Sequence, residues 1–248
     1  MLSQQRIATP KGKTLPPADR CHDRLMYREM ADKTFRDDQW SRRFESHVAP
    51  LNEQILTLTR GEPAPPLIPP MHGGVAARIV EVFRDPGPKA GGPRGSGFLS
   101  WQNDDRSAER HAGLAKCAGL LPQDVVSLNS YLWYINREPT SDELRDGLGA
   151  FLSLYALIKA PSVVIFHGGT AHKFRRLLER EAPGWSRPSG SRPVILETYH
   201  TSAQALHHAD PAVREARTKH LFDSLCVAAR AIGRTSAPRC TCPASPTI

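Results

Sequence analysis

The sequence predicts an α/β protein: a three-layer α/β/α sandwich around a central, mainly parallel four-stranded sheet. Four short apolar runs alternate with helical segments along the 248-residue chain, which is the order expected of parallel strands joined by helices. The runs are nearly continuous in apolar residues, as strands buried on both faces are. Glycine and proline gather between the runs, where the chain must turn.

Each expected strand is followed by an expected helix. The strands are Ala77–Phe83, Val125–Tyr131, Ser162–His167 and Pro193–Tyr199. The helices are approximately Ser107–Leu120, Ser141–Lys159, Thr170–Glu181 and Pro211–Ile232. Acidic residues follow Ser141 directly, in the first turn where carboxylates favour the helix dipole.

The segment before the sheet is expected to be partly helical. Residues 20–60 have a helical pattern, which we expect to be interrupted at Pro50 because proline removes a helix hydrogen bond. Residues 61–74 hold five prolines and are expected to form an extended linker.

Length and composition predict one domain over residues 21–233, with a flexible tail at 1–20 and a disordered tail at 234–248. No apolar run approaches the roughly 20 residues of a membrane span, and the first residues lack an apolar secretory segment. The five cysteines are few and irregularly spaced, which favours a reducing compartment over a disulfide scaffold. We expect a cytoplasmic monomer without membrane contact.

The net charge of +8 lies mostly in the last third of the chain, where residues 169–248 hold twelve Lys/Arg and six Asp/Glu. Such a surface attracts phosphate-bearing partners, including nucleic acids. A soluble, mildly basic protein without such a partner has the same composition.

Three polar residues lie at the ends of three expected strands. Asp85 follows the first strand, Asn129 ends the second, and His200 follows the fourth. In an open parallel sheet the carboxyl ends of the strands form the ligand crevice. We therefore expect these three side chains to face one site.

Each of the three residues has a chemical and a structural interpretation. Asp85 either orients a water and stabilises a cation or caps a turn and pairs with Arg84. Asn129 either reads an imide edge through its carboxamide or forms a local Asx turn. His200 either donates to a developing anion or is simply structural.

The residues 91–97 form a glycine-rich loop that lacks the Gly-Lys-Ser/Thr ending of a P-loop, which excludes that class of nucleotide hydrolysis. Phe98, at the end of the loop, either stacks on a planar ligand or packs in the core. The His and Cys spacings fit no common metal site. We expect no metal and no cofactor.

Taken together and in this order, these segments resemble the uracil-DNA glycosylase superfamily, in an atypical bacterial-type branch. The matching segments are Arg84-Asp85-Pro86-Gly87-Pro88, Phe98, Leu128–Ile135, Val163–Lys173 and His200-Thr201-Ser202. The resemblance extends over about residues 45–230.

The resemblance implies an enzyme that flips uracil out of DNA and hydrolyses its glycosidic bond, which starts base-excision repair. Its partner is uracil-containing DNA, single- or double-stranded. It implies catalysis by Asp85 and His200. The substrate-binding residues that it implies are Arg84, Pro86, Gly87, Phe98 and Asn129, and the DNA-binding residues are Gly95, Ser96, His172, Lys173, Ser202, Gln204 and Leu206. Of the last two, Leu206 is the apolar candidate for entering the minor groove, and Gln204 lies nearest the family's usual leucine.

The chain departs from the family's best-known pattern at one position of the base pocket. Gly87 replaces the tyrosine that excludes thymine there, and some glycine-bearing branches accept other bases. Three alternatives follow: a glycosylase for hypoxanthine or xanthine, a DNA- or nucleotide-binding protein with little or no turnover, and an unrelated hydrolase of small nucleosides.

Overall fold

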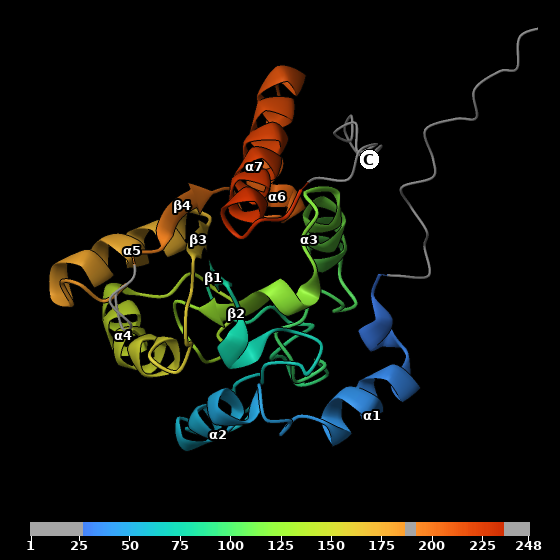
Figure 1. The fold of residues 1–248 in the computed structure, drawn as a ribbon, viewed down its shortest axis with the longest axis vertical. Coiled ribbons are helices and arrows are strands. Elements are labelled where there is room, and N and C mark those ends of the chain that lie inside the picture. The colour runs from blue at the N-terminus through green and yellow to red at the C-terminus, as the bar shows by residue number, and fades with distance from the viewer. Residues whose placement is uncertain (1–26, 187–191, 236–248) are drawn as a thin grey trace, which may run out of the picture.

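The computed structural model describes residues 27–186 and 192–235, so the expected tail 1–20 and nearly all of the expected tail 234–248 lie outside the described residues. Four strands form one sheet, with the order β2-β1-β3-β4 and every neighbouring pair parallel. Helices lie on both sides of this sheet (Figure 1). The predicted three-layer α/β/α architecture is therefore confirmed.

All four expected strands form, and each is one to two residues shorter at one or both ends than predicted. They are β1 Ile79–Phe83, β2 Val125–Asn129, β3 Val163–His167 and β4 Val194–Thr198. The helices that follow them in the chain are α3 Arg106–Cys117, α4 Ser141–Tyr155, α5 Gly169–Glu181 and the pair α6 Ala203–Leu206 and α7 Pro211–Ala231.

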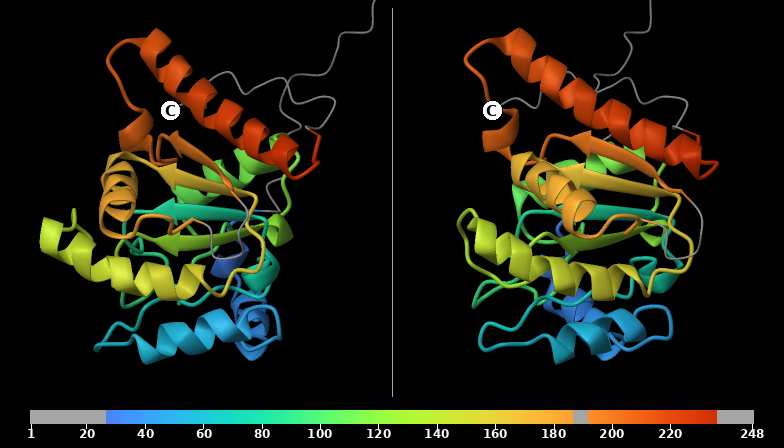
Figure 2. Two further views of the ribbon diagram at one scale, coloured as in Figure 1. Left: turned by 60° about the vertical axis from the view of Figure 1, so that its left-hand side comes forward. Right: turned by 90° about the vertical axis from the view of Figure 1, so that its left-hand side faces the viewer.

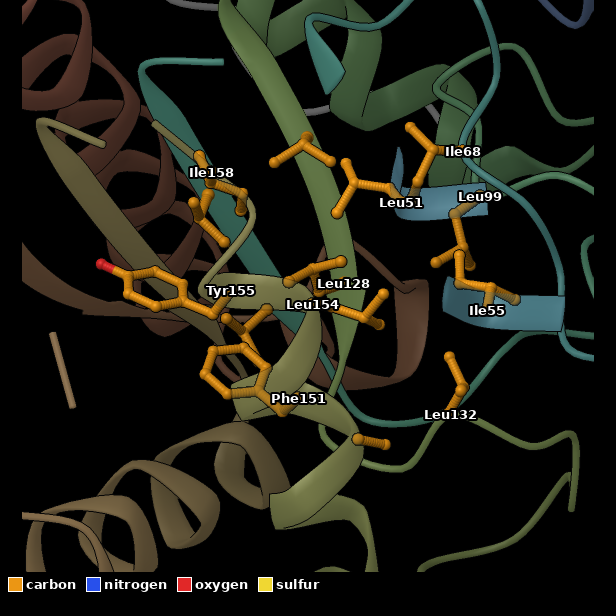
Figure 3. Packing of buried hydrophobic residues seen from close by; sticks show 14 of the residues in the cluster. Leu51, Ile55, Ile68, Leu99, Leu128, Leu132, Phe151, Leu154, Tyr155 and Ile158 are labelled. Carbon is orange, nitrogen blue, oxygen red and sulfur yellow. The ribbon is translucent and has the colours of Figure 1, made fainter. Parts of the chain in front are cut away.

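Strand alternation divides the apolar side chains into two cores, because successive residues point to opposite faces. Val80 and Val82 pack with α4, α5 and the earlier helix α2 (Ala49–Thr57), whereas Ile79 packs with α3 and α7. Figure 2 shows α7 across one face of the sheet and α4 across the other. Figure 3 shows the first core, in which Leu128 of β2 lies near Leu154 of α4.

The helical region before the sheet breaks at a different place from the one predicted. Helix α1 (Lys33–Ser41) ends before residues 42–48, and α2 begins at Ala49. Pro50 therefore lies in the first turn of α2, not at the break. A proline is tolerated there because the first backbone N–H groups of a helix have no intrahelical acceptor.

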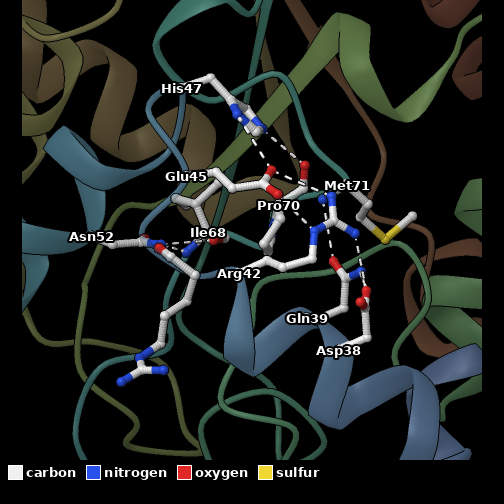
Figure 4. Close-up of polar contacts among 10 residues, drawn as sticks. Asp38, Gln39, Arg42, Glu45, His47, Asn52, Ile68, Pro70 and Met71 are labelled. Carbon is white, nitrogen blue, oxygen red and sulfur yellow. Dashed lines mark hydrogen bonds and ion pairs between the residues drawn. The ribbon is translucent and has the colours of Figure 1, made fainter.

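The proline-rich segment 61–74 was predicted to be an extended linker, but it contains bends and a turn and is packed into the protein. Asn52 of α2 is fully buried and its amide donates to the carbonyl oxygens of Arg43 and Ile68, at 2.7 and 2.9 Å. The N–H of Ile68 donates back to Asn52 at 2.7 Å. Figure 4 shows this network beside Gln39, which accepts from the N–H of Met71.

Arg234, the first residue of the predicted tail, contacts the folded domain. The guanidinium of Arg234 binds both carboxylate oxygens of Asp124, with contacts of 2.8 and 3.0 Å. The backbone N–H of Arg234 also donates to the carbonyl oxygen of Ala229 at 2.8 Å, which provides a donor for a carbonyl of the last turn of α7. Within the described residues, no helix combines the length and apolarity needed to cross a bilayer.

Candidate active site

The three polar strand-end residues lie at one edge of the sheet. Asn129 is the last residue of β2 and pairs in register with Phe83, the last residue of β1. Asp85 lies two residues beyond β1, and His200 lies two residues beyond β4, after Thr198. Because the strands are parallel, their carboxyl ends form a single edge, as the sequence predicted.

The carboxylate of Asp85 is buried, with 2 % of its side chain exposed. It accepts from Nε of Arg84 and, at 3.1 Å, from the backbone N–H of Asn136. Burial raises the pKa of Asp85, and these donors oppose the rise. The pairing with Arg84 that we considered as a structural role thus exists, and it holds an acid in a desolvated place suited to stabilising a cation.

The side-chain amide of Asn129 has an unsatisfied donor. The residue is 5 % exposed, and its buried Nδ2 has no hydrogen-bond partner in the structure. An Asx turn would need the N–H of Tyr131, but that group donates to the carbonyl oxygen of Arg84 at 3.0 Å. A buried amide without a partner is costly, so a ligand is the natural acceptor for this group.

The imidazole of His200 is held in one tautomer. Its Nδ1 accepts from the backbone N–H of Ser202 at 3.0 Å, so the proton of the neutral ring is on Nε2. Burial, together with His111 and Arg84, lowers the pKa of His200 to about 4. At neutral pH the residue is therefore an uncharged donor.

A tight turn brings the chain after β3 against His200. Gly168 has φ +87° and its N–H donates to the carbonyl oxygen of Thr198 at 2.7 Å. A Cβ at this position would lie 3.1 Å from Cβ of His200. Glycine is needed here both for the left-handed backbone and for the close approach.

Phe98 lies in the core in this structure. Its ring is 0 % exposed and packs against Trp40 of α1, with ring centroids 4.9 Å apart. The hydroxyl of Ser96 accepts from the N–H of Phe98 at 3.1 Å and contacts Asn103 at 2.6 Å. A Cβ on Gly95 would lie 2.5 Å from the carbonyl oxygen of Ala90. The expected phosphate loop is therefore compact, and the core-packing interpretation of Phe98 describes its position.

Two expected DNA-binding residues of α5 have protein partners. Nε2 of His172 lies 3.1 and 3.0 Å from the carbonyl oxygens of Phe166 and Thr198. Lys173 is exposed and forms an ion pair of 2.7 Å with Glu138. A phosphate at Lys173 must therefore compete with this carboxylate.

The segment after His200 is also different from our expectation in one respect. Ser202 caps α6, where its hydroxyl accepts from the N–H of Ala205 at 3.3 Å. Gln204 is exposed, but Leu206 is 7 % exposed and belongs to the core beneath α7. The structure therefore places Leu206 inside the protein, not where it would meet DNA, because the short α6 turns this side chain toward α7.

Sequence reasoning missed a buried polar cluster under the site. Glu81, in the middle of β1, is 0 % exposed and accepts from His111 at 2.8 Å and from Nε1 of Trp101 at 2.9 Å. Ser127 and His167 lie 3.3 and 3.8 Å from the same carboxylate. The available signal was a glutamate within an otherwise apolar strand, which calls for buried partners.

The partners of Glu81 determine its charge state. Burial alone would raise the pKa of this carboxyl, but the imidazoles of His111 and His167 and the hydrogen bond from Trp101 lower it to about 2. Across residues 27–186 and 192–235, no group of three or more His, Cys, Asp or Glu is arranged to hold a metal ion. Glu81 and its partners form a buried, hydrogen-bonded cluster next to the sheet edge.

Part of the chain matches a known protein family. The family model described as the uracil DNA glycosylase superfamily matches residues 98–223. The matched segment includes Asn129 and His200 and begins after Asp85. No curated protein matches the chain.

Proposed function

Because the chain belongs to the uracil DNA glycosylase superfamily, we propose that it hydrolyses the N-glycosidic bond of uracil in DNA and leaves an abasic site. The observation that carries the proposal is the unpartnered, buried Nδ2 of Asn129. It lies at the sheet edge that also bears a buried carboxylate and a neutral imidazole. We expect the amide to bind the base, the carboxylate to stabilise the sugar, and the imidazole to stabilise the base as it departs.

Asn129 is proposed to identify the base. Flipping the nucleotide from the helix costs a few kcal/mol, which contacts with the extruded base must offset. The Asn129 oxygen accepts from N3–H of uracil, and Nδ2 donates to O4. Cytosine has the reverse order, an acceptor at N3 and a donor at N4. The amide held in this orientation therefore distinguishes uracil from cytosine.

Asp85 and His200 are proposed to act on opposite partners of the breaking bond. As the C1′–N1 bond breaks, its electron pair leaves with uracil and positive charge develops on the sugar. The carboxylate of Asp85 stabilises that charge and orients the attacking water. As the water oxygen bonds to C1′, the water releases a proton to Asp85. Nε2–H of His200 donates to the uracil anion.

The remaining expected DNA contacts are proposed to hold the backbone. Ser202 and the exposed Gln204 follow His200 in the chain, and Lys173 can bind a phosphate that replaces Glu138 as its partner. We expect an indirect contribution to DNA binding from Gly95, Ser96 and His172. Each already contacts protein atoms, and these contacts hold the local backbone in place.

The test uses a fluorescent oligonucleotide with one deoxyuridine, and a thymine oligonucleotide as the matched control. Purified protein should produce an alkali-labile site and free uracil from the first only. Tight binding of the uracil strand without base release would instead support a binding protein. Activity on free deoxyuridine but not on DNA would support a nucleoside hydrolase.

The pH dependence of excision should lack an inflection near 6.5, where an ordinary histidine titrates. His200 is neutral above its pKa of about 4, and Asp85 must lose its proton to act. Because burial raises the pKa of Asp85, the single-turnover rate should stay level around neutral pH and fall in acid, starting at a higher pH than an ordinary aspartate would require. A rate that increases from pH 7 to 5 would contradict these assignments.

Gly87 favours a broader range of bases, including hypoxanthine and xanthine. A Cβ at Gly87 would meet no atom within 4 Å, so a larger side chain can begin there without a clash, and the space beside this glycine is open. We expect Gly87→Tyr to retain uracil excision and to lose at least tenfold in excision of hypoxanthine or xanthine, roughly the effect of a 1–3 kcal/mol steric selection. Gly87→Ala, which leaves most of this space open, should behave as the wild type does in the same base panel.

A further inference from the structure

The peptide group between Thr201 and Ser202 lies between His200 and an arginine of another helix. Its N–H, which belongs to Ser202, donates to Nδ1 of His200 at 3.0 Å. Its carbonyl oxygen, which belongs to Thr201, accepts from Nη1 of Arg110 in α3. The peptide bond is trans, so its C=O and N–H point in opposite directions from one plane. Arg110 and His200 therefore contact opposite sides of a single rigid group.

Helix α3 brings Arg110 to the carboxyl edge of the sheet. Arg110 is in the second turn of the helix that follows β1, and a helix that connects two parallel strands begins near the carboxyl end of the first. The next residue, His111, is 3 % exposed and bonds to Glu81 of β1 at 2.8 Å, which fixes α3 against the sheet. Figure 1 shows α3 beside α6, the short helix that follows Thr201 and Ser202.

The charge of Arg110 strengthens the hydrogen bond on the other side of the peptide group. A guanidinium stays protonated in proteins, and its carbonyl partner belongs to Thr201, which is 2 % exposed. A cation at a carbonyl oxygen polarises the amide and makes its N–H a stronger donor, as in other linked hydrogen bonds. The stronger donor keeps Nδ1 of His200 an acceptor, and the proton of the neutral ring is then on Nε2.

A second arginine binds the same segment farther along the chain. Nη1 of Arg217 in α7 lies 3.1 and 2.7 Å from the carbonyl oxygens of Ala205 and His207. Both arginines hold backbone carbonyls after His200, but of the two only Arg110 contacts the peptide group that donates to His200. The roles of the two arginines can therefore be separated.

We infer that Arg110 is a positioning residue for His200, because it holds and polarises the peptide group whose N–H selects the tautomer of the imidazole. The inference rests on the proposed function, in which Nε2–H of His200 donates to the departing uracil. It adds a residue that touches neither base nor sugar and acts through the backbone of Thr201 and Ser202.

Nitrogen-15 NMR of the free protein, labelled at histidine, measures the tautomer directly. A protonated and an unprotonated ring nitrogen have well-separated shifts, and the spectrum of His200→Gln assigns the signals of His200. At neutral pH the wild type should show a protonated Nε2 and an unprotonated Nδ1. Arg110→Met keeps an unbranched side chain and removes the guanidinium, so both shifts should move toward the averaged values of a ring that exchanges between tautomers.

Arg106→Met is the matched control. Arg106 is exposed and lies one turn before Arg110 on the same helix, so the substitution removes the same charge and should leave the shifts of His200 as in the wild type. Arg110→Lys keeps a cation and should restore most of the wild-type shifts. If Arg110→Met does not fold, Arg110→Gln, which keeps an N–H donor without the charge, should show a smaller displacement in the same direction.

Excision supplies a second measurement. The single-turnover rate on a deoxyuridine strand should fall about tenfold in Arg110→Met, less than the hundredfold or more expected when a preorganised donor is removed outright. The affinity for a strand with a tetrahydrofuran abasic analogue should stay unchanged. Wild-type shifts in Arg110→Met, or an equal displacement in Arg106→Met, overturn the inference. Slower excision with wild-type shifts also overturns it, since Arg110 would then act on the DNA.

The two proposals fail in different ways, because the spectra do not depend on turnover. Wild-type protein that releases no base overturns the proposed function, and the shifts of the Arg110 variants still decide how His200 is held. Wild-type protein that releases uracil, with wild-type shifts in Arg110→Met, overturns the inference alone.

Discussion

Asp85→Asn is expected to slow uracil excision by roughly a hundredfold to ten-thousandfold, the range for removing a positioned acid–base or electrostatic group. The variant keeps the size of the side chain and an acceptor for the N–H of Asn136. It removes the negative charge that stabilises the cationic sugar. The single-turnover rate on a deoxyuridine strand measures the effect.

The same substitution should leave stability unchanged or increase it. Burial raises the pKa of Asp85, so the folded state binds its proton more tightly than the unfolded state does. The free energy of unfolding therefore decreases as pH rises through the raised pKa of Asp85. At neutral pH the buried charge opposes folding. Asparagine removes the cost of burying that charge. Arg84, which loses its ion-pair partner, is 42 % exposed and can be solvated by water.

Asp146→Asn is the matched control for Asp85→Asn. Asp146 is paired with Arg60, and 40 % of its side chain is exposed. This variant should keep full excision activity. Equal activity of Asp85→Asn and the wild type would show that another group supplies the negative charge, and a large drop in melting temperature would show that Asp85 is chiefly structural.

Glu81→Leu is expected to destabilise the protein by about 3–5 kcal/mol, the usual result of removing one member of a buried pair. His111 and Trp101 would each keep a buried N–H with no acceptor. For a protein of this size the melting temperature should fall by about 10 °C. Thermal and urea unfolding followed by circular dichroism measure the change.

Glu81→Gln separates the charge from the hydrogen bonds at this position. Glutamine retains an acceptor oxygen, so its loss of stability should be clearly smaller than that of Glu81→Leu. Leu196→Ala on β4, in the same core but partly exposed, controls for general damage to that face. A melting temperature of Glu81→Leu equal to that of the wild type would contradict the role of the cluster.

The two faces of the sheet have different tasks. The face toward α2, α4 and α5 receives Val80, Val82 and Leu128, which are apolar and fully or almost fully buried. The opposite face receives Glu81, Phe83 and their partners next to the site. One side of each strand therefore stabilises the fold while the other carries polar groups up to the crevice.

Strand and helix positions could be predicted because they depend on local pattern. Runs such as Val125-Val126-Ser127-Leu128 are β-rich and bounded by turns. Helix α4 begins after Thr140, whose hydroxyl accepts from the N–H of Glu143. Pro50 shows the limit of such reasoning. The same residue stops a helix or begins one, and the choice depends on where the preceding chain is held.

By itself the sequence determined that acid, amide and imidazole side chains share one edge, because parallel strands of known order in the chain place their carboxyl ends together. Only the tertiary structure decided that Phe98 and Leu206 are buried, that His200 carries its proton on Nε2, and that the ring of Phe83 is stacked on His167. Burial and protonation depend on atoms contributed by distant segments. No local pattern encodes those contacts, so burial and the protonated nitrogen of His200 could be identified only in the folded chain.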